Sequence, residues 1–296
     1  MNFTELLDLH KISYKENVST SKISSIRAGG VAKIIIYPDN FEKMIYAVKA
    51  CQAYFDKFKI IGGCTNTFFR DFGYCGGIIC TRRLFDVKID GLYVTASAGA
   101  PLSSILRFAR DNEIELASEL FGIPGTLGGA VRNNAGAFGK DISNVFTDGI
   151  FLNTDDCSLT SISSENLRFA YRESLLQSEN LILLSGRLKG KFLPRDEINE
   201  GFKKSVVKRR ESQPSEASLG SFFKRTPGVI PAKLIDEAGL RGVSIGGAAV
   251  SQKHAGFIVN NGSATSSDID NLASKIENVI FEKNGIRLAR EAEYVI

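Results

Sequence analysis

The chain has 296 residues, of which 43% are apolar and 24% charged, and 37 basic and 33 acidic side chains give a net charge of +4. This length and composition accommodate one large or two medium domains with a buried core. The mild positive charge falls short of that of a nucleic-acid-binding protein. Five cysteines without a C-x-x-C pair and only two histidines argue against a metal site and favour reduced thiols over a disulfide framework.

We expect no signal peptide at the N-terminus of this sequence. Glu5 and Asp8 precede every Lys and Arg residue, and no apolar segment of a signal peptide follows them. No uninterrupted apolar run approaches the roughly 18 residues that a membrane span needs. We therefore expect a cytoplasmic protein that is not inserted in a membrane.

The sequence predicts alternating helices and strands before residue 112. They are a helix followed by a loop over 1–25, a strand at 32–37, an amphipathic helix at 41–55, short strands at 58–61, 77–81 and 93–98, and a helix at 101–111. The strand at 58–61 ends in a glycine-containing loop at 62–66. The helix at 101–111 begins with a proline, which is typical of a first helical turn.

The organising stretch of the chain is 121–139, which reads FGIPGTLGGAVRNNAGAFG and contains six glycines. Its apolar residues distinguish it from a flexible linker, which is polar and rich in Ser. Glycine allows backbone to approach a ligand closely, and concave runs of N–H groups suit phosphate. From composition alone the stretch is equally consistent with a ligand cradle and with a cluster of structural turns.

Further elements are expected after this stretch. They are β-ribbon and loop over 141–168, a buried strand at 181–185, helices at 195–210, 231–238 and 267–283, a strand at 256–260, and a closing strand around 285–295. The helix at 195–210 ends in a cluster of basic residues (Lys203, Lys204, Lys208, Arg209 and Arg210). This cluster is interpreted either as a solvated helix face or as a phosphate-binding surface.

The common nucleotide-binding motifs are absent from the sequence. No two glycines stand at positions i and i+2, which excludes the G-x-G-x-x-G fingerprint. Gly139-Lys140 resembles the end of a P-loop, but Asp141 replaces its Ser or Thr and Asn134 replaces its first Gly. A phosphate-containing ligand would therefore be held by a different architecture.

Several ordered motifs together resemble the UDP-N-acetylenolpyruvoylglucosamine reductase (MurB) family. These are SIRAGG (25–30), IGGCTN (61–66), GIPGTLGGAVRNNAGAFG (122–139), YRES (171–174), Arg209 with QP (213–214) and GSFFK (220–224), AKLIDEAGLRG (232–242), HAGFIVN (254–260) and LARE (288–291). They occur in the family's order over residues 20–292. The short connection between Tyr171 and the strand at Leu181 resembles the family's second type.

The resemblance implies an α+β fold: a two-lobed FAD-binding module of the vanillyl-alcohol-oxidase kind, followed by a C-terminal α/β substrate-binding lobe. The expected bounds are 1–75 and 76–195 for the FAD-binding lobes and 196–296 for the C-terminal domain. FAD would be bound non-covalently. The residues expected to bind it are Arg27, Gly62, Gly63, Cys64, Thr65, Asn66, Gly122, Ile123, Pro124, Gly125, Gly128, Gly129, Asn134, Gly136 and Ala137.

The resemblance also implies a reaction, the NADPH-dependent reduction of the enolpyruvyl ether of UDP-N-acetylglucosamine to a lactyl ether. This step belongs to peptidoglycan precursor synthesis and hence serves cell-wall formation, cell shape and division. Hydride would pass from NADPH to FAD and from flavin N5 to the substrate. Ser221 would donate the proton, Arg172 would pair with the substrate carboxylate, and Glu291 would stabilise the intermediate.

Substrate contacts are expected from Tyr171, Gln213, Lys224 and Arg225. Arg225 stands where the family usually has Asn, and Cys64 where it usually has Gly. We expect a monomer with a UDP-sugar substrate. Two alternatives are an alcohol or sugar oxidase of the same flavin fold, which does not need the Arg172, Ser221 and Glu291 set, and a flavin-binding protein without activity.

Overall fold

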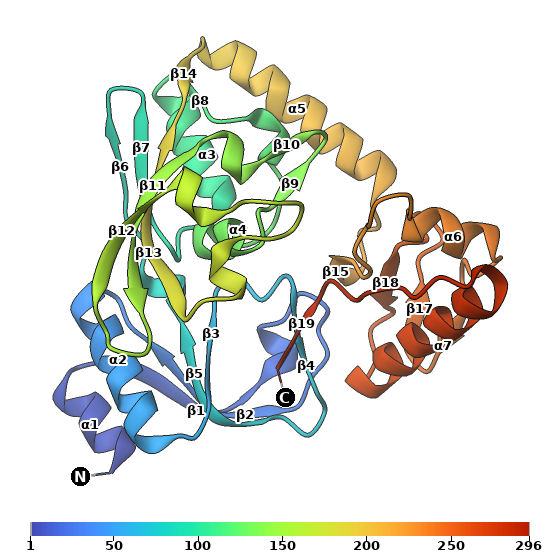
Figure 1. The fold of residues 1–296 in the computed structure, drawn as a ribbon, viewed down its shortest axis with the longest axis horizontal. Helices are drawn as coiled ribbons and strands as arrows, with labels where there is room; N and C mark the ends of the chain where they lie inside the picture. The colour runs from blue at the N-terminus through green and yellow to red at the C-terminus, as the bar shows by residue number, and fades with distance from the viewer. Residues whose placement is uncertain (1, 296) are drawn as a thin grey trace. The chain divides into compact units, whose positions relative to one another are not determined.

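The computed structural model describes residues 2–295, so the first residue of the expected N-terminal lobe and the last of the C-terminal domain lie outside it. The described chain forms two compact units. The first comprises 2–15, 35–63 and 76–209, and the second comprises 16–34, 64–75 and 210–295. We describe each unit by itself, and the three-part division expected from the sequence stays a prediction. Figure 1 labels the helices and strands.

Residues 2–80 contain two α-helices and five strands. They are α1 (Phe3–Leu9), β1 (Ser13–Ser19), β2 (Val31–Tyr37), α2 (Phe41–Tyr54), β3 (Phe58–Ile61), β4 (Thr67–Phe69) and β5 (Tyr74–Cys80). Four of the strands form a sheet in the order β1-β2-β5-β3. The loop expected before residue 25 is wrong in part, because Ser13–Ser19 is a strand. It lies at the sheet edge with a largely exposed, polar sequence, so it lacks the apolar alternation that identifies a strand.

A five-stranded antiparallel sheet forms the centre of the first unit, in the order β12-β11-β13-β7-β6. Figure 1 shows β11, β12 and β13 side by side. The elements of this region are β6 (Val87–Asp90), β7 (Tyr93–Ser97), α3 (Leu102–Asp111), β8 (Ile114–Glu115), α4 (Leu127–Arg132), β9 (Gly136–Ala137), β10 (Lys140–Asp141), β11 (Phe146–Asn153), β12 (Leu159–Ser163), β13 (Leu181–Lys189), β14 (Lys191–Phe192) and α5 (Arg195–Ser212). The apolar faces of α3 and α4 join the sheet in one hydrophobic core.

The second unit contains a four-stranded antiparallel sheet in the order β15-β18-β17-β16 and a parallel pair, β19 with β4. Its further elements are β15 (Ala217–Ser221), α6 (Pro231–Glu237), β16 (Ser244–Ile245), β17 (Ala248–Val250), β18 (Phe257–Asn260), α7 (Ser266–Asn284) and β19 (Glu293–Val295). The long helix α7 confirms the expected amphipathic helix and buries Ile269, Leu272, Ile276 and Ile280. A capping box at Thr265 starts it and Gly285, in the left-handed conformation, ends it.

The strand expected around residues 285–295 is wrong for most of its length. Only its last three residues form β19, and Arg290 makes an isolated bridge with Phe223. In the described chain, residues 289–291 pair through their backbone only with residues 222–224. This pairing is too short to form a regular strand. Within residues 2–295 no helix is both long and apolar enough to cross a membrane.

Candidate active site

The two glycine-containing loops of the first unit touch through their backbones. A Cβ added to Gly63 would lie 2.8 Å from Cα of Gly125, and one added to Gly62 would lie 2.3 Å from Oγ1 of Thr126. Real Cβ atoms do not approach other atoms this closely. The glycines at 62 and 63 are therefore required by the packing of one loop on the other, whatever the loops bind.

A buried hydroxyl without a partner marks this contact. Thr126 is 4% exposed, and within the described part of the chain its Oγ1 has no hydrogen-bond partner. Leaving such a group unsatisfied costs about 1–3 kcal/mol, and a polar ligand that reaches it on binding would remove this cost. A hydroxyl beside close-packed backbone fits the phosphate and ribose oxygens of FAD. Thr126 is not among the residues predicted from the sequence, although its place next to Gly125 could have indicated it.

Asn134 connects the glycine-rich stretch to the segment that carries Arg172. Its side chain is buried, donates from Nδ2 to the carbonyl of Ala170 (2.9 Å) and accepts from the N–H of Ser143 (3.3 Å). Its φ of +37° is positive, which Asn tolerates better than most residues. The predicted cofactor residue Asn134 therefore supports the chain just before Arg172.

Arg172 itself is held against the same stretch. Its Nη2 donates to the carbonyl of Gly136 at 2.9 Å, and its guanidinium lies 5.0 Å from the ring centre of Tyr171. Its φ of +59° is uncommon for a residue with a Cβ, and such strain is frequent at functional sites. The structure thus joins Arg172, predicted to be catalytic, with two predicted cofactor residues of the first unit, Asn134 and Gly136.

The basic cluster of α5 has more than one role. Lys203 pairs with Glu200 at 2.6 Å on the exposed helix face. Arg209 instead donates to the carbonyl of Phe121 at 3.2 Å, and its guanidinium lies 5.2 Å from the ring centre of Phe138. Burial lowers the pKa of Arg209 from its usual value. Arg209 therefore braces the start and the end of the glycine-rich stretch.

In the second unit the backbone pairs the two segments that carry Ser221 and Glu291. The N–H of Glu291 donates to the carbonyl of Phe222 at 2.9 Å, and the N–H of Lys224 donates to the carbonyl of Ala289 at 2.8 Å. Phe222 is buried in the core, whereas Ser221 at the end of β15 is exposed. Ser221 and Glu291, both predicted to be catalytic, therefore lie on segments whose backbones are hydrogen-bonded to each other.

Asn66 holds Glu291 from the other side of its backbone. The Asn66 side chain donates from Nδ2 to the carbonyl of Glu291 at 3.1 Å, and the Asn66 carbonyl accepts from the N–H of Glu293 at 2.8 Å. Asn66 lies directly before β4, which runs parallel to β19. A residue predicted to bind the cofactor thus also fixes the backbone of a predicted catalytic residue.

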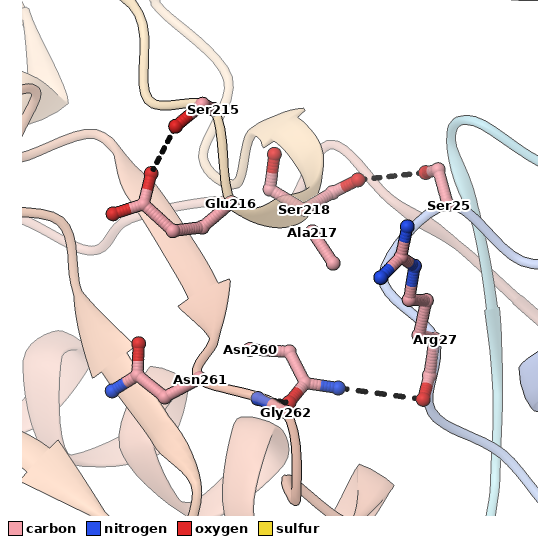
Figure 2. Close-up of a pocket in the computed structure, with 9 residues that line it drawn as sticks. All are labelled: Ser25, Arg27, Ser215, Glu216, Ala217, Ser218, Asn260, Asn261 and Gly262. Carbon is pink, nitrogen blue, oxygen red and sulfur yellow. Dashed lines mark hydrogen bonds between the residues drawn. The ribbon is translucent and has the colours of Figure 1, made fainter.

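An open pocket of about 660 Å³ lies in the second unit, lined by Ser25, Arg27, 215–218 and 260–262. Figure 2 shows the Arg27 guanidinium turned toward this space from the segment 25–27. Asn260 holds the base of the segment by donating to the carbonyls of Ile26 (2.8 Å) and Arg27 (3.3 Å). Ser25 Oγ donates to the carbonyl of Ser218 at 2.6 Å. The pocket gives the predicted cofactor residue Arg27 an accessible, polar surrounding.

Three further predicted residues, Cys64, Gln213 and Arg225, have distinct surroundings. The bounds of the two units divide the loop at 62–66 after Gly63, and Cys64 is buried with a φ of +53°. This backbone conformation explains why a glycine would suit the position. Gln213 follows α5 and is half-buried, whereas Arg225 is exposed beside the turn at 226–229. Nothing in their surroundings assigns these two side chains a ligand.

Comparisons with known proteins identify the two parts of the chain. Residues 32–151 match an FAD-binding domain family, and residues 213–295 match the C-terminal domain of UDP-N-acetylenolpyruvoylglucosamine reductase. The reductase of Caldicellulosiruptor saccharolyticus is 34% identical over 298 residues, covering 100% of this chain and 96% of that protein. The reductase of Clostridium botulinum is 35% identical over 296 residues, with the same coverage.

The crystal structure of the Thermus caldophilus reductase matches 96% of this chain and 99% of its own, with a TM-score of 0.82 and 26% identity. These similarities confirm the predicted fold, an FAD-binding module followed by a C-terminal domain. The matches to the two reductases and to the crystal structure cover 96–99% of those proteins, so the fold is shared over nearly their whole length. The chain therefore belongs to the UDP-N-acetylenolpyruvoylglucosamine reductase family of oxidoreductases.

Proposed function

We propose that this protein reduces the enolpyruvyl ether of UDP-N-acetylglucosamine enolpyruvate to UDP-N-acetylmuramate, with NADPH as the electron source. The reaction belongs to peptidoglycan precursor synthesis in the cytoplasm and thereby serves cell shape and division. Full-length similarity to the reductases supports the activity. The observation that carries the residue assignment is the pairing of residues 222–224 with 289–291, which brings the segments of Ser221 and Glu291 together.

FAD fits the glycine loops of this chain. Gly62, Gly63, Gly125 and the unsatisfied hydroxyl of Thr126 would hold its polar groups, as close backbone approach and a buried donor suit a pyrophosphate. Neither glycine loop contains His, so we propose non-covalent binding. When bound, FAD supplies the hydride that is added to the methylene carbon of the substrate.

Ser221 is proposed to donate the proton that completes the reduction. Its O–H bond breaks as a C–H bond forms at the α-carbon of the substrate. A Ser hydroxyl is a weak acid, so this step requires a strongly basic carbanion directly beside it. The exposed position of Ser221 at the end of β15 makes its hydroxyl accessible, while the buried Phe222 fixes the backbone behind it.

Arg172 and Glu291 are proposed to stabilise the negative charge that develops before this proton transfer. The planar guanidinium of Arg172 matches the two oxygens of the substrate carboxylate, and its contact with Gly136 limits its movement. Glu291 would act by hydrogen bonding as an acid or through a water molecule. Tyr171, Gln213, Lys224 and Arg225 are proposed to contact the substrate, with the two cations facing its diphosphate.

An anaerobic absorption experiment tests the proposal. The purified protein, reconstituted with FAD where necessary, receives NADPH and then the enolpyruvyl substrate. We expect the flavin absorption to bleach with NADPH and to return on addition of substrate. Recovery with oxygen alone would indicate an oxidase, and a flavin that neither reagent changes would indicate a binding protein without activity. Failure to bind FAD would refute the assignment of the glycine loops.

A further inference from the structure

The residue that precedes Glu291 is the centre of a cluster of charged side chains in the second unit. The guanidinium of Arg290 donates to both carboxylate oxygens of Glu277, at 2.6 and 2.9 Å, to Oγ of Ser274 at 2.9 Å, and to Asp270. Asp270, Ser274 and Glu277 are spaced four and three residues apart and lie on one face of α7. The Arg290 side chain thus connects the segment before β19 to three residues on one face of α7.

The cluster is closed by a second arginine and a tyrosine. Arg70 donates to Asp270 at 2.5 Å, the hydroxyl of Tyr294 donates to the same carboxylate at 3.0 Å, and both guanidinium groups lie within 6 Å of the Tyr294 ring centre. The side chains of Arg290 and Asp270 are 20% and 18% exposed. Two cations face two carboxylates, so the cluster is neutral and mostly shielded from water.

This arrangement adds a side-chain anchor to a segment with little regular structure. The backbone of Glu291 is held at its N–H by Phe222 and at its carbonyl by Asn66, but the strand β19 begins only at residue 293. A cluster of ion pairs removed from water contributes little net stability, because desolvation offsets the attraction. The several hydrogen bonds of the planar Arg290 guanidinium instead restrict the position of the next residue, Glu291.

We propose that Arg290 is a positioning residue: through Glu277, Ser274 and Asp270 it fixes the backbone of Glu291 relative to the segment that carries Ser221. The inference rests on the proposed role of Glu291 in the reaction. A catalytic group has to be held within about 0.5 Å of its productive position, so a looser anchor slows the step that uses Glu291. The step affected is the reoxidation of reduced flavin by the enolpyruvyl substrate.

The test uses the FAD-loaded protein under anaerobic conditions. Arg290→Lys keeps the positive charge but cannot bind Glu277, Ser274 and Asp270 together. We expect reoxidation by the enolpyruvyl substrate to slow about tenfold, with reduction by NADPH unchanged. The matched control is Arg241→Lys, since Arg241 also pairs with a carboxylate (Asp236) and a backbone carbonyl (Gln252) in the second unit, and neither partner belongs to the cluster around Arg290. The control should reoxidise at the original rate.

A double-mutant cycle with Glu291→Gln separates positioning from general structural damage. If Arg290 acts through Glu291, Arg290→Lys should have no further effect on reoxidation once Glu291 is replaced. An equal slowing in both backgrounds, or no slowing in the original protein, would refute the positioning role. If Glu291→Gln alone leaves reoxidation unchanged, the proposed catalytic role of Glu291 is refuted, and the positioning role of Arg290 is refuted with it. Glu277→Gln serves as the second variant should Arg290→Lys not fold, and the same coupling is expected.

Discussion

Replacing Gly63 by Ala tests the contact between the two glycine loops. The new Cβ would lie 2.8 Å from Cα of Gly125, whereas ordinary van der Waals contact begins near 3.4 Å, so the loops must separate by about 0.6 Å. The neighbour is backbone rather than a flexible side chain and cannot rotate away. Overpacking of this kind costs about 1–3 kcal/mol. With an unfolding entropy of about 2.1 cal/mol/K per residue, each kcal/mol lowers the Tm of a chain of 296 residues by about 1.6 °C.

Thermal unfolding of the FAD-free protein, followed by circular dichroism, measures this cost, and absorption of the FAD-loaded protein after gel filtration measures how much flavin is retained. Gly129→Ala is the control for unfolding of the FAD-free protein, because its Cβ would meet only Oγ1 of Thr126 at 3.8 Å and it lies inside α4. Gly129 is itself a predicted cofactor residue, so flavin retention is compared with the original protein. Alanine in a helix interior is favoured over glycine by roughly 0.5–1 kcal/mol, so this variant should unfold at the same or a higher temperature. A Gly63→Ala variant that unfolds with the control and retains all its flavin would refute the reasoning.

Three further predictions concern the reaction and the second unit. Ser221→Ala should leave reduction by NADPH intact and slow reoxidation by substrate at least about 100-fold, and unchanged stopped-flow rates would remove Ser221 from its role. Arg172→Lys should slow the same step by about 10- to 100-fold, because a point charge cannot replace the planar fork; equal rates would contradict carboxylate binding. Asp71 accepts hydrogen bonds from the N–H groups of Ser266 and Ser267, both at 2.8 Å, at the start of α7. Partial burial alone would raise the pKa of Asp71, but bonds from both serines outweigh it and hold the pKa below its usual value. The ionised form is therefore stabilised by folding, and because the exposed side chain is screened by water, Asp71→Asn should lower stability by only about 0.5–1 kcal/mol above pH 5. This difference should vanish as the pH falls through the lowered pKa, and equal urea midpoints at pH 7 would disprove it.

The sequence by itself determined the elements whose signal is local. The helices α2 and α7 follow from apolar residues at helical spacing, and α3 begins directly after the expected proline, Pro101. The glycine-rich stretch could be recognised because close backbone packing requires glycine, and six glycines within residues 121–139 are visible in the sequence. The ordered motifs then identified the family. The strand β1 escaped detection because an exposed edge strand needs no apolar face.

Only the tertiary structure decided which distant segments meet. The contact of Gly63 with Gly125 and the pairing of Phe222 with Glu291 join residues that are far apart in the sequence. The pattern of apolar residues indicates which side chains are buried, but it does not indicate which residues pack against them. Arg290 shows this most clearly. In the sequence it is a basic residue of the LARE motif with no partner indicated, and its proposed role as an anchor arises because Asp270, Ser274 and Glu277 lie on the face of α7 that it contacts.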